Sequence, residues 1–199
     1  NQYLKLLTIE GYENVKNEEF LRSAIKDFWS KYGGKEYDGL AAKLAIFGAN
    51  IDEVIEDIKP VVEKVLSELG IPHSKVLVNV RESKVTTNKD IRDFNNLDRV
   101  GTEGAEKQFI ILVNKGREGW NCRSLFGVAL FRTPKSKVFV LQATMRCLRQ
   151  ITDIQQKATV YLSKENMDIL DQELRQNFRV TVDGINELNK DDNKEDVYV

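Results

Sequence analysis

The sequence predicts an α/β fold with three layers, a mainly parallel sheet and helices on both of its faces. Apolar runs of strand length recur along the chain, and the clearest is QFIILV at 108–113. These runs are continuously apolar, which is typical of strands that are buried on both faces. From Leu44 onward they alternate with helical patterns, which favours crossover helices and parallel pairing.

The elements can be placed in order from their patterns and end signals. Asn17 opens a helix that stops at Gly33-Gly34, and Ser163 caps another that begins at Lys164. Pro60 lies inside a helix and is expected to kink it. The expected strands are 44–47, 76–80, 108–113, 125–130 and 157–162, and the expected helices are 17–32, 50–69, 90–97, 137–150 and 164–178.

Three parts of the chain are expected to differ in organisation. Residues 1–40 lack a strand–helix alternation and are interpreted as a helical lead-in or accessory segment. Residues 41–180 carry the alternation and form the main domain. Residues 181–199 are acidic and polar, and we expect a disordered tail. Because the chain starts at Asn1 without a methionine, we expect an excised fragment.

The charges are segregated, although the net charge of the 199 residues is only −1. Between Asn114 and Gln150 there are eight basic residues and one acid, while 183–199 holds six acids and two lysines. A basic segment inside a neutral protein predicts a local anion site rather than general adhesion to polyanions.

Cysteine and histidine give little indication of catalysis. Cys122 and Cys147 form no CxxC pair, which argues against a structural zinc site, and each is expected to have a packing role. Two lone thiols fit a reducing, cytoplasmic compartment. His73 has no evident catalytic partner in the sequence and is interpreted as incidental. We find no signal peptide and no apolar stretch long enough to span a membrane.

The most informative stretch is the predicted helix 137–150 together with the loop before it. Gln142, Arg146 and Arg149 fall at i, i+4 and i+7 and therefore share one face, beside an apolar stripe. Two guanidinium groups one turn apart suit a polyanion such as a phosphate chain. Solvated surface arginines are the alternative interpretation for the helix taken alone. The loop NKGREGWNCRSL at 114–125 follows the clearest strand, where ligands of open α/β sheets bind.

The motifs resemble those of a known family. Glu118-Gly119-Trp120-Asn121, followed by Gln142-x-x-x-Arg146-x-x-Arg149, resembles motifs V and VI of superfamily-two helicases and translocases. The pattern is most similar to that of the restriction subunit of type III restriction enzymes. The resemblance covers about 107–162 and extends less specifically back to Leu44. It implies a RecA-like, P-loop NTPase-type helicase C-terminal domain, the second motor domain of an ATP-driven enzyme.

The resemblance also implies roles for single residues. Arg146 and Arg149 resemble arginine fingers that reach the ATP phosphates across an interdomain cleft. Gln142 resembles the motif VI glutamine near the nucleotide, and Gly119 and Asn121 resemble the motif V positions near the ribose. The sequence departs from the pattern twice, because Asn121 replaces the usual Asp and Met145 the usual Gly.

The sequence lacks other parts of an ATPase. There is no GxxxxGK[ST] phosphate loop and no DExx-type motif, and Asp90, Asp93 and Asp98 are interpreted as scattered in a polar loop. We therefore expect ATP and Mg²⁺ to be held mainly by an N-terminal RecA-like domain outside this chain, and the isolated chain to be inactive. No PD…ExK nuclease pattern is present either.

Nucleic acid is the expected polymeric partner, with DNA favoured and RNA as an alternative. In this family the second domain contacts the backbone of one strand through loops that follow the earlier strands. A solvated polar loop is the alternative for each candidate. The further expected partners are the N-terminal RecA-like domain and a modification or specificity subunit, with no membrane. The candidates are Gly48–Asn50, Lys84, Thr86, Thr87, Lys115 and Arg117.

Three functions are compatible with these features. The leading one is the C-terminal motor domain of an ATP-dependent DNA helicase or translocase of a type III-like restriction or defence system. The alternative is a non-catalytic RecA-like module that binds nucleic acid or a protein. A nucleotide-binding domain acting alone is a third interpretation, and the missing phosphate loop argues against it.

Overall fold

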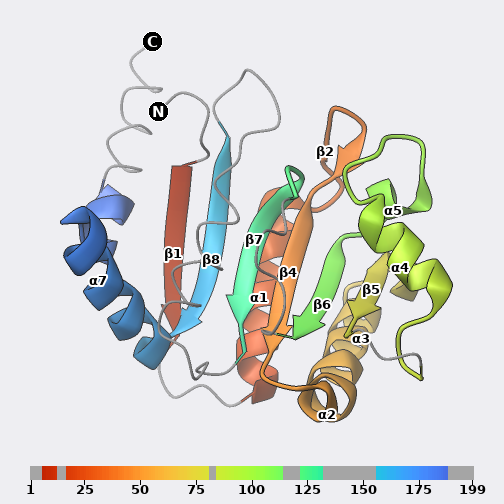
Figure 1. Cartoon of the computed structure of the whole chain (residues 1–199), viewed down its shortest axis with the longest axis horizontal. Coiled ribbons are helices and arrows are strands. Elements are labelled where there is room, and N and C mark those ends of the chain that lie inside the picture. Colours follow the sequence, from red (N-terminus) through yellow and green to blue (C-terminus); the bar gives the residue numbers. More distant parts are fainter. Residues whose placement is uncertain (1–5, 13–16, 81–83, 114–121, 132–155, 188–199) are drawn as a thin grey trace.

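The computed structural model describes residues 6–12, 17–80, 84–113, 122–131 and 156–187. They form a sheet of six parallel strands in the order β1-β8-β7-β4-β6-β5 (Figure 1). The predicted fold class is therefore confirmed. The strands are β1 (Leu6–Tyr12), β4 (Lys43–Gly48), β5 (Val76–Asn79), β6 (Phe109–Val113), β7 (Leu125–Leu130) and β8 (Lys157–Ser163).

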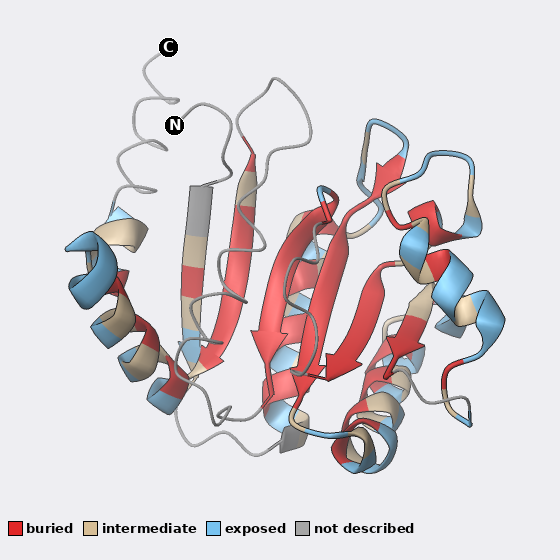
Figure 2. Cartoon of the chain, in the orientation of Figure 1, coloured by how far each residue is buried: buried red, intermediate tan, exposed pale blue. Residues whose placement is uncertain are grey.

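The central strands are buried on both faces, which explains their continuous apolar sequences. In β4, Leu44 and Ile46 belong to one apolar cluster, while Ala45 and Phe47 belong to the cluster on the other face. The same alternation occurs along β6. Figure 2 shows these strands as the most completely buried part of the molecule. Successive side chains of a strand point to opposite faces, so burial on both sides requires every position to be apolar.

Helices cover both faces of the sheet. α1 and α3 lie behind it in Figure 1 and contribute to the first cluster, whereas α7 contributes Leu170 and Leu174 to the second. Ser163 caps α7 by accepting a hydrogen bond from the Asn166 N–H at 3.1 Å, as predicted. The helices are α1 (Asn17–Tyr32), α2 (Ile51–Glu53), the π-helix η1 (Val54–Ile58), α3 (Lys59–Glu68), the 3₁₀-helix η2 (His73–Lys75), α4 (Asn88–Asn95), α5 (Glu103–Glu106) and α7 (Lys164–Phe178).

The segment expected to be an accessory lead-in is part of the same sheet. β1 pairs in parallel with β8, with Leu6 opposite Lys157 and Tyr12 opposite Ser163. α1 follows β1 and buries Leu21, Ala24, Ile25 and Phe28, among others, in the first cluster. The structure thus differs from the expectation for residues 6–32, because the strand–helix alternation starts at β1 and not at Leu44.

Pro60 does not break its helix but follows a widened turn. The Lys59 N–H donates to the Val54 carbonyl five residues earlier, as in a π-helix. Proline has no N–H, and its ring collides with the carbonyl four residues before it in an ordinary α-helix. A π turn just before Pro60 relieves both conflicts, so α2, η1 and α3 form one continuous helical path from Ile51 to Glu68.

Two further features differ from the expectations. A small hairpin, β2 (Glu36–Tyr37) and β3 (Leu40–Ala41), turns at Asp38 and Gly39, both with positive φ. Its Tyr37 ring stacks on Phe126 of β7 with centroids 4.2 Å apart. At the other end of the chain, residues 182–187 are helical and Val182 is buried, so this part of the expected tail is ordered.

Candidate nucleotide and nucleic-acid interface

The carboxyl ends of the six parallel strands meet at one edge of the sheet, the lower edge in Figure 1. The connection that leaves β4 leads to β5 on one side, and the chain that leaves β7 leads to β8 on the other side. Neighbouring strands whose connections diverge in this way define a topological switch point, where α/β sheets bind ligands. The site suggested by the topology therefore lies outside the carboxyl ends of β4 and β7.

The loop after β4 is held by side chains of the helix that follows it. Asn50 Oδ1 accepts a hydrogen bond from the Glu53 N–H at 2.8 Å, and Glu53 Oε1 accepts one from the Ala49 N–H at 3.0 Å. A side chain at Gly48 would meet Ile58 and Val54, so the close helix approach requires glycine there. Two N–H groups that could otherwise bind a phosphate are thus already paired within the loop.

The loop after β5 uses its two threonines to shape itself. Thr86 is buried, and its hydroxyl accepts from the Val80 N–H at 3.0 Å and donates to the Val78 carbonyl at 3.1 Å. Thr87 caps α4 in a capping box with Asp90. Lys84 is exposed at the same edge. Among these predicted contacts, the Lys84 side chain is exposed and accessible to a phosphate group, whereas the Thr86 hydroxyl is already hydrogen-bonded within the loop.

Most of the predicted site residues lie outside the described part of the structure. The segments that carry them are attached to described strands: 114–121 follows β6, and 132–155 follows β7. β6 and β7 are the two neighbours of β4, so both segments leave the sheet beside its centre. The residues concerned are Lys115, Arg117, Gly119, Asn121, Gln142, Arg146 and Arg149.

Asp98 has a structural role that the sequence did not reveal, at the opposite edge. Its carboxylate accepts hydrogen bonds from the Arg123 N–H at 2.6 Å, the Ser124 N–H at 3.0 Å and the Ser124 hydroxyl at 2.8 Å. Burial raises the pKa of Asp98, but these hydrogen bonds and nearby Lys43 outweigh it and hold the pKa below its ordinary value. Asp98 therefore fixes the start of β7. Asp98 does lie in a loop, between α4 and α5, but its carboxylate is bonded to the start of β7 and not simply solvated.

Cys122 and Lys43 complete a polar cluster beside Asp98. Burial, reinforced by the Asp98 charge, raises the pKa of the Cys122 thiol to about 12, so the buried thiol is inert packing, as expected. The Lys43 ammonium donates to the Ala41 carbonyl at 2.7 Å and the Ala105 carbonyl at 3.1 Å. The polar character of this strand start was not anticipated, since Lys43 precedes an apolar run and carries no sequence signal of burial.

Neither a metal centre nor a membrane span is found in the described ranges. Within them, no group of three or more His, Cys, Asp or Glu side chains is placed to hold a metal ion. None of their helices is long and apolar enough to cross a membrane.

No protein-family model and no curated protein matches the chain, whereas solved structures do. Domain 2 of the DEAD-box helicase Mss116p, bound to an RNA duplex, superposes with a TM-score of 0.55 at 14% identity, over 88% of this chain and 60% of that one. Saccharomyces cerevisiae Dbp5, bound to RNA and ADP BeF3, gives 0.56 at 14% identity, over 98% and 46%. The ATP-dependent type ISP restriction-modification enzyme LlaBIII, bound to DNA, gives 0.53 at 16% identity, over 80% and 12%.

These likenesses define the fold. The chain has a RecA-like fold, a parallel six-stranded sheet flanked by helices, and it superposes on RecA-like helicase domains. The chain spans 60% or less of the length of these three structures.

Proposed function

We propose that this chain is the C-terminal motor domain of an ATP-dependent DNA helicase or translocase. The observation that carries the proposal is the strand order, because the motif-bearing segments follow β6 and β7 in the sequence. These two strands flank β4, next to the switch point of the sheet, which supports a site built from the segments that follow them. The candidate residues are taken from the motif resemblance. The strands that precede them, β6 and β7, end at the carboxyl edge of the sheet.

Arg146 and Arg149 would act on ATP that is bound by a separate N-terminal RecA-like domain. Arginines supplied from a facing domain stabilise the charge that develops on the transferred phosphoryl group. Gln142, Gly119 and Asn121 would contact the nucleotide from this side. The chain has no phosphate loop, so the partner domain would hold Mg²⁺ and the β- and γ-phosphates.

DNA would run across the carboxyl edge of the sheet, with RNA as the alternative. Lys84, Lys115 and Arg117 are the proposed backbone contacts, because cations bind phosphate without reading sequence. The Thr87 side chain is the neutral candidate, at the exposed start of α4. Thr86 would position the loop rather than bind phosphate, because its hydroxyl is already paired.

The finer assignment is a type III-like restriction or defence system, with a modification or specificity subunit as a further partner. It rests on the EGWN and QxxxRxxR patterns. The two lone thiols of the chain fit a reducing compartment, so we propose a cytoplasmic location.

The decisive experiment uses a protein in which this chain is joined to an N-terminal RecA-like domain. In a longer protein that carries the N-terminal RecA-like domain, Arg146→Ala and Arg149→Ala should each lower kcat for ATP by on the order of 10³-fold, the lower range for arginine fingers. Arg175→Ala is the matched control, because Arg175 is an exposed arginine on α7 that pairs only with its own helix neighbour Asp171 among the contacts found. Unchanged ATP turnover in both finger variants would refute the motor function and favour a non-catalytic binding module.

A further inference from the structure

The end of α3 brings a histidine back over the last turn of its own helix. Gly70, with a φ of +72°, ends the helix in the left-handed conformation. The Ile71 N–H then donates to the Leu66 carbonyl at 2.9 Å, and the chain reverses through Pro72 into η2. His73 is the first residue of η2, so this reversal places its ring beside the exposed face of α3.

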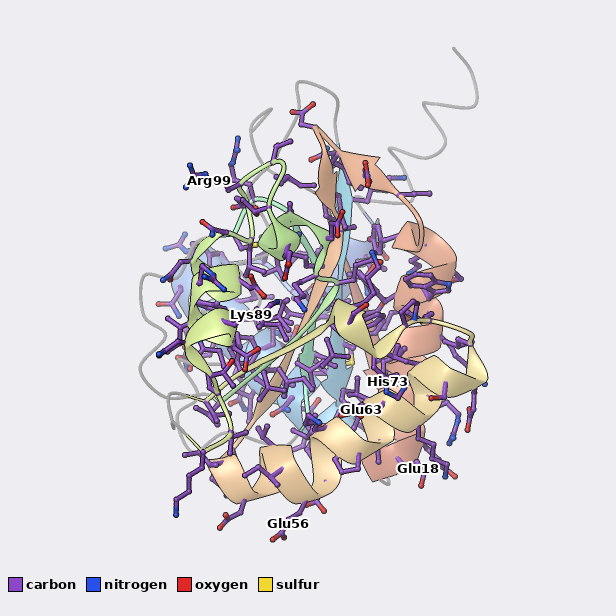
Figure 3. All side chains as sticks on the ribbon, turned by 90° about the vertical axis from the view of Figure 1, so that its right-hand side faces the viewer. Glu18, Glu56, Glu63, His73, Lys89 and Arg99 are labelled. Atoms are coloured by element: carbon purple, nitrogen blue, oxygen red, sulfur yellow. The ribbon has the colours of Figure 1, made fainter. Side chains whose placement is uncertain are left out.

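The His73 ring lies between a serine and a carboxylate of α3. Its Nε2 is 2.7 Å from Ser67 Oγ, and its Nδ1 is 3.4 Å from Glu63 Oε2. Glu63 and Ser67 are four residues apart and therefore share one helix face. The other Glu63 oxygen, Oε1, accepts a hydrogen bond from the Lys59 ammonium. Figure 3 shows Glu63 and His73 next to each other on the surface.

This order of groups is the arrangement that activates a nucleophile. A carboxylate beside Nδ1 favours the tautomer that carries its proton there, which leaves Nε2 as the acceptor for the serine hydroxyl. A hydroxyl within hydrogen-bond distance of a base that a third group orients is the structural signature of an activated nucleophile. The site is open, because Ser67 is exposed and the His73 side chain retains 47% of its accessible surface.

We propose that Ser67 is a reactive nucleophile that accepts an acyl group from an activated ester, with His73 as the general base and Glu63 as the residue that orients it. Ser67 Oγ attacks the ester carbonyl carbon, and its proton moves to His73 Nε2. The bond between the carbonyl carbon and the leaving oxygen breaks. The imidazolium returns the proton to that oxygen, so the products are acyl-Ser67 and a free alcohol or phenol.

The same geometry predicts that the reaction stops at the acyl-serine. An activated ester acylates Ser67 with the help of its good leaving group, whereas hydrolysis of acyl-Ser67 must expel the poor serine alkoxide and depends more on N–H groups aimed at the oxyanion of the tetrahedral intermediate. The N–H groups of Leu69, Gly70 and Ile71 all donate to carbonyls of residues 65–67. This helix end therefore supplies no pair of amides to that oxyanion. We infer a site of stoichiometric covalent modification rather than an esterase.

The chain contains its own control for this proposal. Trypsin releases residues 65–75, VLSELGIPHSK, a peptide that holds both Ser67 and the exposed Ser74. The whole chain is treated with p-nitrophenyl acetate, and the acetylation of each serine is followed over time by fragmentation of that peptide. Ser67 should acetylate on the order of 10²-fold faster than Ser74, the lower end of what a positioned general base contributes.

Variants test whether His73 activates Ser67 or whether their hydrogen bond only stabilises the end of α3. His73→Ala and His73→Gln should each reduce the Ser67 rate to that of Ser74, while Glu63→Gln should reduce it severalfold. Circular dichroism checks that each variant keeps its fold. Equal rates at the two serines in the unmodified chain would overturn the proposal, as would a Ser67 rate that is unchanged in a folded His73 variant.

Discussion

The buried lysine at the start of β4 provides a quantitative test of the structure. Lys43 has no accessible surface, and its ammonium meets two carbonyl oxygens. Burial lowers the pKa of Lys43 from 10.5 to about 8, and repulsion by Lys75 adds to the effect, while the nearby Cys122 and Asp98 oppose it. The perturbation is Lys43→Met, which keeps the length of the side chain and removes its charge.

The sign of the pH dependence follows from which state binds the proton more tightly. The folded chain releases the Lys43 proton near pH 8, whereas the unfolded chain keeps it to about pH 10.5. Between these values the unfolded state binds more protons, so the lysine contribution to the free energy of unfolding rises with pH. The gap between the two pKa values corresponds to about 3 kcal/mol in total, and most of it falls between pH 7 and pH 10.

Urea unfolding at several pH values between 7 and 10 measures this difference. The free energy of unfolding of the unmodified chain, minus that of Lys43→Met, should increase by about 2–3 kcal/mol over this range. Burial raises the pKa of Cys122 and Tyr12, each to about 12, so their contributions to stability are lost as pH rises. Because both proteins contain these groups, their effects largely cancel in the difference.

Lys107→Met is the matched control. Lys107 also donates to a backbone carbonyl, that of Ser74 at 2.7 Å, but it stays partly exposed. Its substitution removes the same charge and the same type of hydrogen bond at a less buried position, so it separates the loss of a lysine from the loss of a buried ammonium group. A Lys43→Met difference that stays constant from pH 7 to pH 10 would refute the buried position of the ammonium group.

Three further predictions concern stability and are measured by urea unfolding. Thr86→Val should cost about 1–3 kcal/mol, because it leaves the Val80 N–H without its side-chain acceptor; a neutral substitution would contradict the internal role of Thr86. Asp98→Ala should cost about 2–3 kcal/mol at pH 7, and this loss should shrink as the pH falls through the lowered pKa of Asp98. Gly127→Ala should cost about 1–3 kcal/mol, because a Cβ there would lie 3.0 Å from the Phe28 ring, and no cost would contradict that packing.

Local sequence patterns determined the elements that depend on neighbouring residues. The bounds of β7 and α7 match the expected 125–130 and 164–178, because a continuous apolar run and a serine cap act within a few residues. The same patterns correctly predicted a mainly parallel sheet. The absence of a phosphate loop is likewise a property of the sequence alone.

Contacts between residues far apart in the sequence determined the features that the sequence did not predict. β1 was missed because its partner β8 lies about 150 residues further along the chain, and only that pairing makes it a strand of the sheet. The sequence favoured solvated loop positions for Thr86 and Asp98, because their hydrogen-bond partners, such as the Val80 N–H and the Arg123 N–H, are identified only by the folded structure. His73 appeared incidental because its contacts with Ser67 and Glu63 depend on the chain reversal at Gly70. Hydrogen bonds and strand order are set by three-dimensional proximity, whereas periodicity and capping are written in the local sequence.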